Sequence, residues 1–343
     1  MQGKSGSGGL PVGKIPLGEL ERLLSASWSF RRPSTLVGPA VGEDAAIISL
    51  GNLDLVFHLD PITEAGELAG WLAVHVASND VAASGARPRW IALAILAPRG
   101  SSGEDLRRIQ GDAEKAAREV GVEIVGGHTE VSPGLSKPVV VAAAAGVTCR
   151  GCAVPTGGAR PGDLVLQVKP AGIEGTAIIA TDFRALLERA GIAESIIERA
   201  AALASRVSVV REALELAEYG LVTSMHDPTE GGLIGGLVEM ALASRLRFKV
   251  WEERVFVAEE TRVVTEALGV DPLKLISSGT LLATVPSSLK GDAEHVLEGL
   301  GVEYSFIGEV EAGGVGVQLY KSPGRIELYE APPVDEISKL WGG

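Results

Sequence analysis

Hydrophobic and polar positions change their spacing several times along the first half of the chain. Short segments that are continuously apolar, or alternate apolar with polar residues, predict β-strands at residues 44–50, 53–59, 90–98, 122–127 and 138–148. Segments whose apolar positions recur every three or four residues predict helices at residues 17–26, 67–85 and 102–121, with Ser102 placed to cap the third. Because strands and helices alternate, this half is predicted to form an α/β or α+β unit.

The second half repeats this alternation after a segment that concentrates Gly and Pro, GCAVPTGGARPGD (residues 151–163). Such a composition between two apolar strands is typical of a linker. Beyond it we expect a strand, LVLQVK, a long helical region at about 175–219, a strand ending at Met225, a helix from about Thr229, and further alternation to residues 307–310. The predicted organisation is a flexible Gly-rich arm (1–16), an N-terminal domain (17–155) and a C-terminal domain (156–343), with an α+β fold class.

Composition narrows the functional classes. The 343 residues are 46% hydrophobic and 22% charged, which indicates a well-packed globular protein of about two domains. The net charge of −13, with no run of Lys or Arg longer than a pair, argues against nucleic acid as a partner. No apolar run is long enough to cross a bilayer and the N-terminus has no signal-peptide core, so we expect a cytoplasmic protein without a membrane partner. The chain has only two Asn and four Gln, which indicates a thermophilic source.

Acidic residues occur in four short motifs flanked by small residues. The motifs are VGEDAAII with Glu43 and Asp44, FHLDPIT with Asp60, ASNDVAASGARP with Asn79 and Asp80, and MHDPTEGG with Asp227 and Glu230. Carboxylate oxygens suit Mg²⁺, which is usually held by one or two carboxylates together with phosphate oxygens and water. A magnesium–triphosphate substrate would neutralise carboxylates that otherwise repel one another and would let an acidic protein bind ATP. A lone Asp at a strand end is more often a turn or cap residue, but Asn79 and Asp80 fall inside a predicted helix, where neither residue type is favoured.

A second polar motif is VGGHTEVSPG (residues 125–134). A strand that ends in Gly126-Gly127 would expose backbone N–H groups to an anion, with His128, Thr129 and Glu130 at the mouth of the turn. Taken alone the signal is weak, because Gly-Gly pairs usually only turn the chain. The N-terminal GKSGSGG lacks the spacing and the preceding strand of a P-loop.

The cysteines and two histidines are ambiguous. Cys149 and Cys152 have C-x-x-C spacing without the second pair that a zinc site needs. A redox pair is one interpretation, and two ordinary thiols at the exit of a strand is the favoured one. His226, beside Asp227, is a candidate base or ligand, whereas His75 on an apolar helix is expected to be a core or interface histidine.

Taken in order, the motifs resemble one superfamily. GEDAA, ND-x-A-x-x-GA-x-P, GGHTEV, DPT-x-GGL, DPL-x-x-x-xSGTLL and IGEV follow the pattern of aminoimidazole ribonucleotide synthase-like proteins over about residues 40–310. That group includes HypE, selenophosphate synthetase and thiamine-monophosphate kinase, and the chain is most similar to archaeal HypE-like members. The resemblance implies a homodimer in which N-terminal strands of two subunits form a β-barrel, a C-terminal domain with a mixed sheet and packed helices, and ATP bound between the domains.

The resemblance also implies roles for individual residues. Asp44, Asp60 and Asp80 match the Mg²⁺–phosphate ligands of the family, and Asp227 matches an acidic residue contributed by the second domain. The candidate metal ligands are therefore Asp44, Asp60, Asp80 and Asp227. The candidate catalytic residues are Asp80, His128 and Asp227. The candidate nucleotide-binding residues are Lys4, Gly42, Asn79, Gly126, Gly127, His128, Thr129, Glu130 and Thr229.

The chain departs from three members of the group, so the resemblance does not identify the acceptor substrate. HypE proteins end in a Pro-Arg-x-Cys-like tail whose cysteine carries a carbamoyl group, and this chain ends EISKLWGG. Selenophosphate synthetases have Cys or selenocysteine with Lys in the N-terminal arm, where this chain has Lys4 alone. Thiamine-monophosphate kinases have Asp in place of His128. We expect a HypE-like, Mg-ATP-dependent phosphoryl-transfer or activating enzyme acting on an unknown small molecule or protein. A small-metabolite kinase, or a noncatalytic nucleotide-binding regulator or assembly partner, is the alternative.

Overall fold

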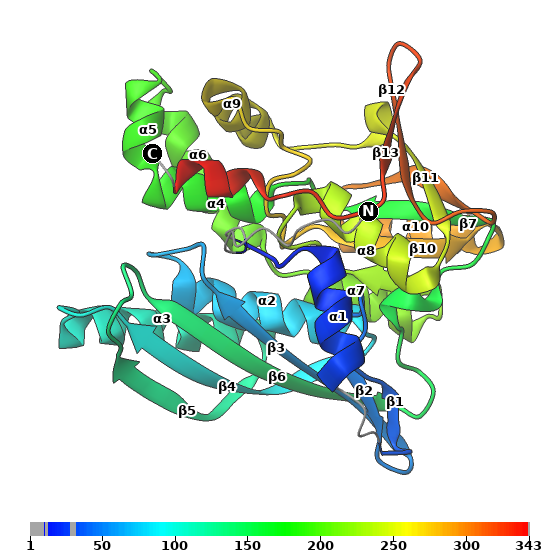
Figure 1. Ribbon diagram of the computed structural model, residues 1–343, viewed down its shortest axis with the longest axis horizontal. Helices are drawn as coiled ribbons and strands as arrows, with labels where there is room; N and C mark the ends of the chain where they lie inside the picture. Colours follow the sequence, from blue (N-terminus) through cyan, green and yellow to red (C-terminus); the bar gives the residue numbers. More distant parts are fainter. Residues whose placement is uncertain (1–9, 11–12, 28–31, 342–343) are drawn as a thin grey trace, which may run out of the picture.

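The computed structural model describes the chain except for residues 1–9, 11–12, 28–31 and 342–343. Two β-sheets with separate sets of helices form two domains, which lie one above the other in Figure 1. The predicted α+β class is confirmed. Within one chain both sheets are open among the described residues, so the structure contains no closed barrel.

The N-terminal sheet has the strand order β1-β2-β3-β6-β4-β5. Its strands are β1 (Thr35–Val37), β2 (Ala46–Ser49), β3 (Leu53–Ile62), β4 (Arg87–Ala97), β5 (Glu123–Val131) and β6 (Val139–Cys149). Neighbouring strands are antiparallel except β4 and β5, which run parallel and are connected by helix α3 (Gly103–Val120). A crossover of this kind is what parallel neighbours require.

Helix α2 (Ala69–Ala83) lies between this sheet and the second domain (Figure 1). Every residue of α2 is buried, because it packs on β3, β6 and α3 on one side and on α7 (Val210–Glu218) on the other. Its many alanines permit this close packing on both sides. Asn79 and Asp80 therefore lie at the junction of the two domains, inside a helix as predicted.

The sequence signals of the other N-terminal helices agree with the structure. Helix α1 spans Leu17–Ser27, and α3 begins after Ser102. Ser102 Oγ accepts a hydrogen bond from the Asp105 N–H at 3.2 Å, and the Ser102 N–H donates to Asp105 Oδ2 at 2.7 Å. This reciprocal pair satisfies two backbone N–H groups at the start of the helix.

The second domain has a seven-stranded mixed sheet with the order β13-β12-β9-β11-β7-β10-β8. Its strands are β7 (Asp163–Val168), β8 (Ser224–His226), β9 (Arg247–Trp251), β10 (Leu281–Pro286), β11 (Tyr304–Glu311), β12 (Gly316–Lys321) and β13 (Arg325–Tyr329). Only β12 and β9 pair in parallel among the described strands of this sheet. Its longer helices, in chain order, are α4 (Ile173–Asp182), α5 (Arg184–Arg189), α6 (Glu194–Ala202), α7, α8 (Gly232–Ser244), α9 (Glu259–Leu268) and α10 (Lys290–Leu300).

Three predicted elements differ from the structure. The single helical region expected at 175–219 is divided into α4, α5, α6 and α7, with breaks such as the left-handed Gly191 that a pattern of apolar residues does not reveal. Helix α8 begins at Gly232 rather than near Thr229, because Gly231 and Gly232 both have positive φ. Strand β5 does not end in a Gly-Gly turn but continues to Val131, pairing Gly127 with Leu93 of β4.

Cys149 and Cys152 also differ from expectation. The favoured interpretation as two ordinary thiols is wrong, because the structure joins them by a disulfide. The C-x-x-C turn brings their Cα atoms to 5.3 Å, which is within the range that a disulfide bridges.

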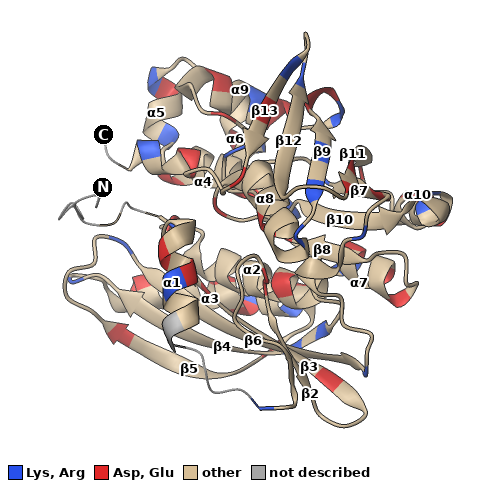
Figure 2. Cartoon of the chain, turned by 45° about the vertical axis from the view of Figure 1, so that its right-hand side comes forward, with Lys and Arg blue, Asp and Glu red and all other residues tan. Residues whose placement is uncertain are grey.

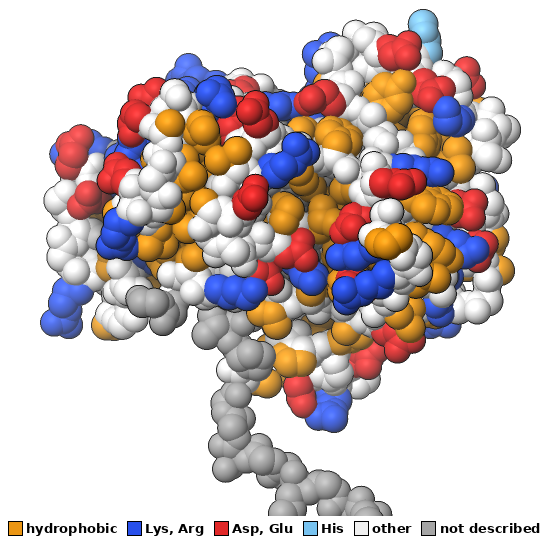
Figure 3. Space-filling model, turned by 90° about the horizontal axis from the view of Figure 1, so that it is seen from above, with side chains coloured by type: hydrophobic (Ala, Val, Ile, Leu, Met, Phe, Trp, Pro, Cys, Tyr) orange, Lys and Arg blue, Asp and Glu red, His pale blue; other side chains and the backbone are white. Residues whose placement is uncertain are grey.

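The surface is mixed in character. Acidic and basic side chains are interspersed over the face shown in Figure 3. The outer face of the N-terminal sheet is more apolar: β6 carries no charged residue, as Figure 2 illustrates, and exposed side chains here include Phe57, Leu59 and Trp90. Among the described helices, none combines the length and the hydropathy that crossing a membrane requires.

Candidate functional site

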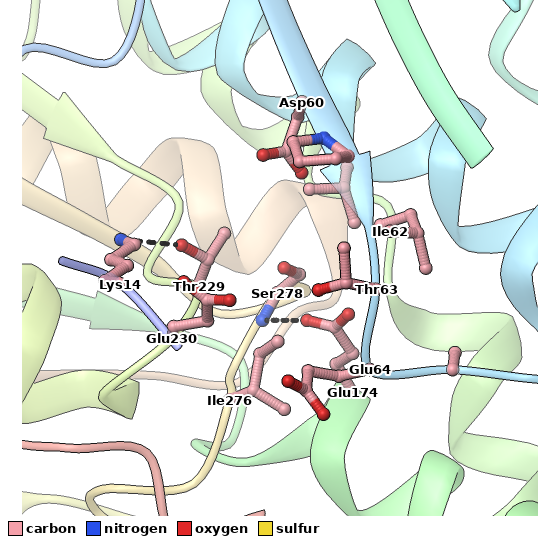
Figure 4. Close-up of a pocket in the computed structure, with 13 residues that line it drawn as sticks. Lys14, Asp60, Ile62, Thr63, Glu64, Glu174, Thr229, Glu230, Ile276 and Ser278 are labelled. Atoms are coloured by element: carbon pink, nitrogen blue, oxygen red, sulfur yellow. Dashed lines mark hydrogen bonds between the residues drawn. The ribbon is translucent and has the colours of Figure 1, made fainter. Parts of the chain in front are cut away.

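A pocket of about 250 Å³ opens between the two domains (Figure 4). Its walls come from the end of β3 and the loop that follows, from α4, from the loop before α8, and from the loop before β10. The lining residues are Lys14, Asp60, Pro61, Ile62, Thr63, Glu64, Ala65, Val76, Glu174, Thr229, Glu230, Ile276 and Ser278. The pocket thus combines four carboxylates with one described lysine, and both domains contribute to it.

Asp80 and Asp44 meet around His58, a residue that the sequence analysis did not select. His58 Nε2 lies 3.1 Å from Asp80 Oδ2, and His58 Nδ1 lies 2.5 Å from the backbone carbonyl oxygen of Asp44. Burial raises the pKa of Asp80 well above its ordinary value, and the neighbouring Asp44 and Asp60 raise it further. The pKa of Asp60 is raised by burial, with His58 opposing the shift. These carboxylates are therefore close enough to repel one another.

A chain of charged contacts connects Asp44 to the N-terminal arm. Asp44 Oδ2 lies 2.5 Å from His226 Nδ1, and His226 Nε2 lies 2.9 Å from Glu239 Oε2. Glu239 Oε1 accepts a hydrogen bond from Lys14 Nζ at 2.9 Å, and Lys14 also donates to Thr229 Oγ1 at 3.2 Å. The last described part of the predicted flexible arm is thus anchored over the pocket.

The charges in this chain of contacts support one another. Burial opposes the charged imidazolium, but Asp44 and Glu239 outweigh it and raise the pKa of His226 well above its ordinary value. Burial likewise opposes the charged form of Glu239, but Lys14 and His226 lower its pKa to about 2. His226 is therefore a cation held between two carboxylates. Neither ring nitrogen is free to act as a base or a metal ligand in this conformation.

Asn79 and Asp227 form the buried contact between the domains. Asn79 Nδ2 donates to Asp227 Oδ2 at 2.9 Å and to the Val207 carbonyl oxygen at 2.8 Å, and Asn79 Oδ1 accepts from the Val209 N–H at 2.9 Å. The Gly279 N–H donates to Asp227 Oδ1 at 3.2 Å. Burial and Asp80 raise the pKa of Asp227 well above its ordinary value. Asn79 thus positions the second domain on α2 and has its hydrogen-bonding groups occupied by protein.

Glu174 and Glu230 are two further carboxyls of the pocket, and of these the sequence motifs had indicated only Glu230. Glu174 is buried at the start of α4, where its Oε2 accepts the Ser278 N–H at 3.2 Å, and burial raises its pKa to about 8. Burial also raises the pKa of Glu230 to about 7, with Lys14 opposing the shift. Glu230 is one of the two acidic residues of the MHDPTEGG motif, although no site role was predicted for it. Nothing in the sequence around Glu174 distinguishes it from an ordinary first-turn helix residue.

The GGHTE segment does not reach the pocket of its own chain. Residues 126–130 are exposed on β5, at the edge of the sheet, and two strands separate β5 from β3, which carries Asp60. His128 Nε2 lies 3.1 Å from Glu130 Oε2 on this surface. A single chain therefore brings Asp44, Asp60, Asp80, Asp227 and Thr229 together but leaves Gly126, Gly127, His128, Thr129 and Glu130 elsewhere.

Gly42 supports the site through close backbone packing. It has φ of 82°, and a Cβ added there would lie 2.3 Å from the Glu239 carbonyl oxygen, so only glycine fits beside α8. Lys4, the other residue predicted from the N-terminal arm, lies outside the described residues.

The oxygen donors fit a magnesium–phosphate ligand better than a bare metal ion. In the described part of the chain, no three His, Cys, Asp or Glu side chains form a ready-made metal site. Mg²⁺ does not require one, because it usually keeps water and phosphate oxygens and takes one or two carboxylates from the protein. Asp60 and Asp80 offer such carboxylates. Burial raises the pKa of both and Asp44 raises it further, so a bound cation would offset the repulsion among these groups.

Comparison with known proteins identifies the family. The models for AIR synthase related proteins match the N-terminal domain over residues 42–148 and the C-terminal domain over residues 160–320. The chain belongs to the AIR synthase related family. The order of motifs in the sequence had indicated this superfamily, and that prediction is confirmed.

Members of the family named for hydrogenase maturation are among its similar relatives. A hydrogenase expression/formation protein of Methanocaldococcus jannaschii is 30% identical over 310 residues, which cover 87% of this chain and 88% of that protein. The carbamoyl dehydratase HypE of Azotobacter vinelandii is 32% identical over 323 residues, covering 90% of this chain and 87% of HypE. A crystal structure of the hydrogenase maturation protein HypE in complex with ATP is 27% identical, with a TM-score of 0.69 over 92% of this chain and 96% of that one.

Proposed function

We propose that this member of the AIR synthase related family is a HypE-like enzyme that binds Mg-ATP between its domains and uses it to phosphorylate or activate an acceptor. The observation that supports this most is a group of neighbouring carboxyls from both domains: Asp60 lines the pocket, Asp44 and Asp60 act on Asp80, and Asp80 acts on Asp227 of the second domain. The ATP complex of the related HypE supports the choice of nucleotide.

Mutual repulsion of the carboxylates supports the role of a divalent cation. Asp80 is 3% exposed and Asp227 is fully buried, and burial together with neighbouring carboxylates raises the pKa of both. Such a group is unfavourable in the protein alone, because a buried charge without a cation is expensive. In the proposed complex Asp60 and Asp80 would hold Mg²⁺, and the ion would supply positive charge against that of the phosphates.

The remaining residues of the pocket would position the nucleotide and the acceptor. Lys14 is a cation at the pocket wall, held by Glu239 and Thr229, and can pair with a phosphate oxygen if it exchanges partners. Glu174 and Glu230 have pKa values raised to about 8 and about 7, so near neutral pH each can give or accept a proton. Positioning and charge neutralisation of this kind account for most catalysis of phosphoryl transfer.

Replacing Asp80 with Asn tests the site. The variant Asp80→Asn keeps the shape of the side chain and removes the carboxylate, so the fold should persist while Mg-dependent ATP affinity falls at least tenfold. Calorimetric titration with and without Mg²⁺ measures this. Asp163→Asn is the matched control, because Asp163 is also buried but lies in β7, where it accepts a hydrogen bond from Thr223 at 2.6 Å. Unchanged affinity in a folded Asp80→Asn protein would refute the assignment.

The acceptor requires a second measurement. Purified protein with Mg-ATP is screened against candidate small-molecule and protein acceptors, and release of ADP or AMP is recorded. An enzyme should show turnover that depends on one acceptor, and the product identifies which phosphate bond breaks. ATP binding without acceptor-dependent turnover would instead favour a nucleotide-binding regulator.

A further inference from the structure

An exposed disulfide lies outside the pocket, at the far end of β6. Cys149 is the last residue of that strand, and all four residues from Cys149 to Cys152 are exposed. The Cys152 N–H donates to the Cys149 carbonyl oxygen at 3.0 Å, and Gly151 adopts a φ of 77°, which closes the turn. Both cysteines are therefore presented at the surface, where another molecule can approach them.

The backbone of this turn is held by contacts other than the disulfide. The Gly151 N–H donates to Oδ2 of the buried Asp54 at 2.7 Å, and the Arg150 N–H donates to the Asn52 carbonyl oxygen at 3.2 Å. Cys149 is also paired with Leu53 in the sheet. Opening the sulfur–sulfur bond therefore leaves the turn attached to β3 and does not require the domain to unfold.

We propose that Cys149 and Cys152 form a thiol–disulfide exchange site that a dithiol reductant opens in the folded protein. Exposed disulfides are the more reducible ones, because exchange requires a thiolate to reach one of the sulfurs. A thiolate of the reductant attacks one cysteine sulfur, forms a mixed disulfide and expels the other cysteine as a thiolate. The second thiol of the reductant loses its proton, attacks the mixed disulfide and releases the first cysteine. Two electrons and two protons pass to the cysteine pair, and the reductant becomes a disulfide.

Arg150 assists this exchange from within the turn. It is the exposed cation between the two cysteines in the chain, and a nearby positive charge favours the thiolate form of a cysteine. The departing cysteine is therefore a better leaving group, and the reduced pair is more reactive towards alkylation. This role depends on charge and can be separated from any contribution to folding.

The state of the disulfide affects the segment that connects the two domains. Two residues beyond Cys152, the Val154 N–H donates to the Ser84 carbonyl oxygen at 3.0 Å, at the C-terminal end of α2. The Thr156 and Gly157 N–H groups then donate to the carboxylate of Glu43 at 3.1 and 3.0 Å. Opening the bond removes a constraint at one end of this short segment. The backbone hydrogen bonds of residues 154–157 should then break more often. Glu43, which accepts two of these bonds, is adjacent to Asp44 and so connects this segment to the pocket.

Alkylation of the folded protein tests the exchange. The full chain is treated with N-ethylmaleimide in native buffer before and after incubation with dithiothreitol, and intact mass is measured. We expect no adduct before reduction, two adducts after it, and reclosure when oxidised dithiothreitol replaces the reductant. A bond that resists millimolar dithiothreitol until urea is added, or a reduced pair that does not reclose, would overturn the proposal.

Three variants separate the chemistry from structural effects. Cys152→Ser leaves a single exposed thiol, which should form a mixed disulfide with glutathione disulfide in the folded protein. Arg150→Gln should slow alkylation of the reduced pair by about threefold or more at neutral pH, as expected when a nearby cation is lost. Arg189→Gln, an exposed arginine on α5, should leave the rate unchanged. Equal alkylation rates in the wild type, Arg150→Gln and Arg189→Gln would overturn the role of Arg150.

Hydrogen exchange tests the connection to the linker. Reduction should speed exchange of the amides at residues 154–157 at least threefold and leave the centre of β6 unchanged. Unchanged linker protection would overturn the connection between the disulfide and the domain junction. Because none of these measurements uses ATP, their failure is distinct from failure of the proposed nucleotide site.

Discussion

Glu174→Gln should stabilise the nucleotide-free protein, which is unusual for a substitution at a buried position. Glu174 is 1% exposed, and burial raises the pKa of its carboxyl from 4.5 to about 8. Below pH 4.5 the carboxyl is protonated in both the folded and the unfolded chain. As the pH rises towards 8, it ionises only in the unfolded chain, so its contribution to folding stability is progressively lost. At pH 7 the unfolded carboxyl is about 2.5 pH units above its pKa of 4.5 and the folded carboxyl is still protonated, so the loss is about 3 kcal/mol.

Glutamine removes this loss because it ionises in neither state. Its amide oxygen can still accept the Ser278 N–H that Glu174 Oε2 accepts at 3.2 Å, so the local hydrogen bond is kept. We expect Glu174→Gln to raise the free energy of unfolding at pH 7 by about 3 kcal/mol, and to change it little at pH 4.5. The same variant should lower acceptor-dependent turnover, because a group that can donate or accept a proton in the pocket is lost.

Urea unfolding followed by circular dichroism, with EDTA present, measures the difference at several pH values. Glu212→Gln is the matched control: Glu212 is also buried, but it lies 3.0 Å from Lys169 Nζ, so losing its charge should destabilise the protein. If Glu174→Gln showed no gain at pH 7, or the same gain at pH 4.5 as at pH 7, the reasoning from burial would be wrong.

Two further predictions concern acid stability and assembly. Burial, assisted by Lys169, lowers the pKa of His75 from 6.5 to about 4, so its stabilising contribution is complete above pH 6.5 and lost as pH falls towards 4. Between pH 7 and pH 4 the free energy of unfolding should therefore fall by about 3 kcal/mol less in His75→Leu than in the wild type, as measured by urea titration. An unchanged pH dependence would contradict this. The exposed apolar face around Phe57 and Trp90 should be covered in a homodimer, so light scattering should give about twice the 35.5 kDa chain mass. Trp90→Glu should shift the measured mass towards that of the monomer. A monomeric wild-type protein would rule out the dimer.

Local sequence patterns predicted the elements of the first domain better than those of the second. The N-terminal strands are short apolar or alternating runs, and α3 has a Ser cap, an amphipathic face and a C-terminal glycine, so several signals agree. Helices α4 and α8 are buried nearly all round, and no change of apolar spacing marks their ends. The predicted domain boundary at 155/156 remains a prediction, although it falls in the segment between the two sheets.

The site was partly predictable for a similar reason. The motif order predicted Asp44, Asp60, Asp80 and Asp227, because the resemblance to the family assigns a role to each of these positions. Lys14, His58, Glu174 and Glu239 were missed because each stands in an ordinary local pattern. They acquire a role through contacts across long separations, such as the 225 residues between Lys14 and Glu239. Only the folded chain reveals contacts of that kind.

The positions of the strands explain why a single chain brings together only some of the family's motif residues. Asp80 and Asp227 are placed by α2 and β8, which pack directly on each other, so a single chain assembles them without help. The GGHTE segment lies at the open edge of the sheet, where no described strand pairs with the outer side of β5 and where Val125 and Val131 are exposed. A second subunit that covered this edge would satisfy its backbone groups and could bring a segment with the composition of an anion site to a neighbouring pocket. Assembly into a dimer would then explain why Gly126, Gly127, Phe57 and Trp90 are all exposed in a single chain.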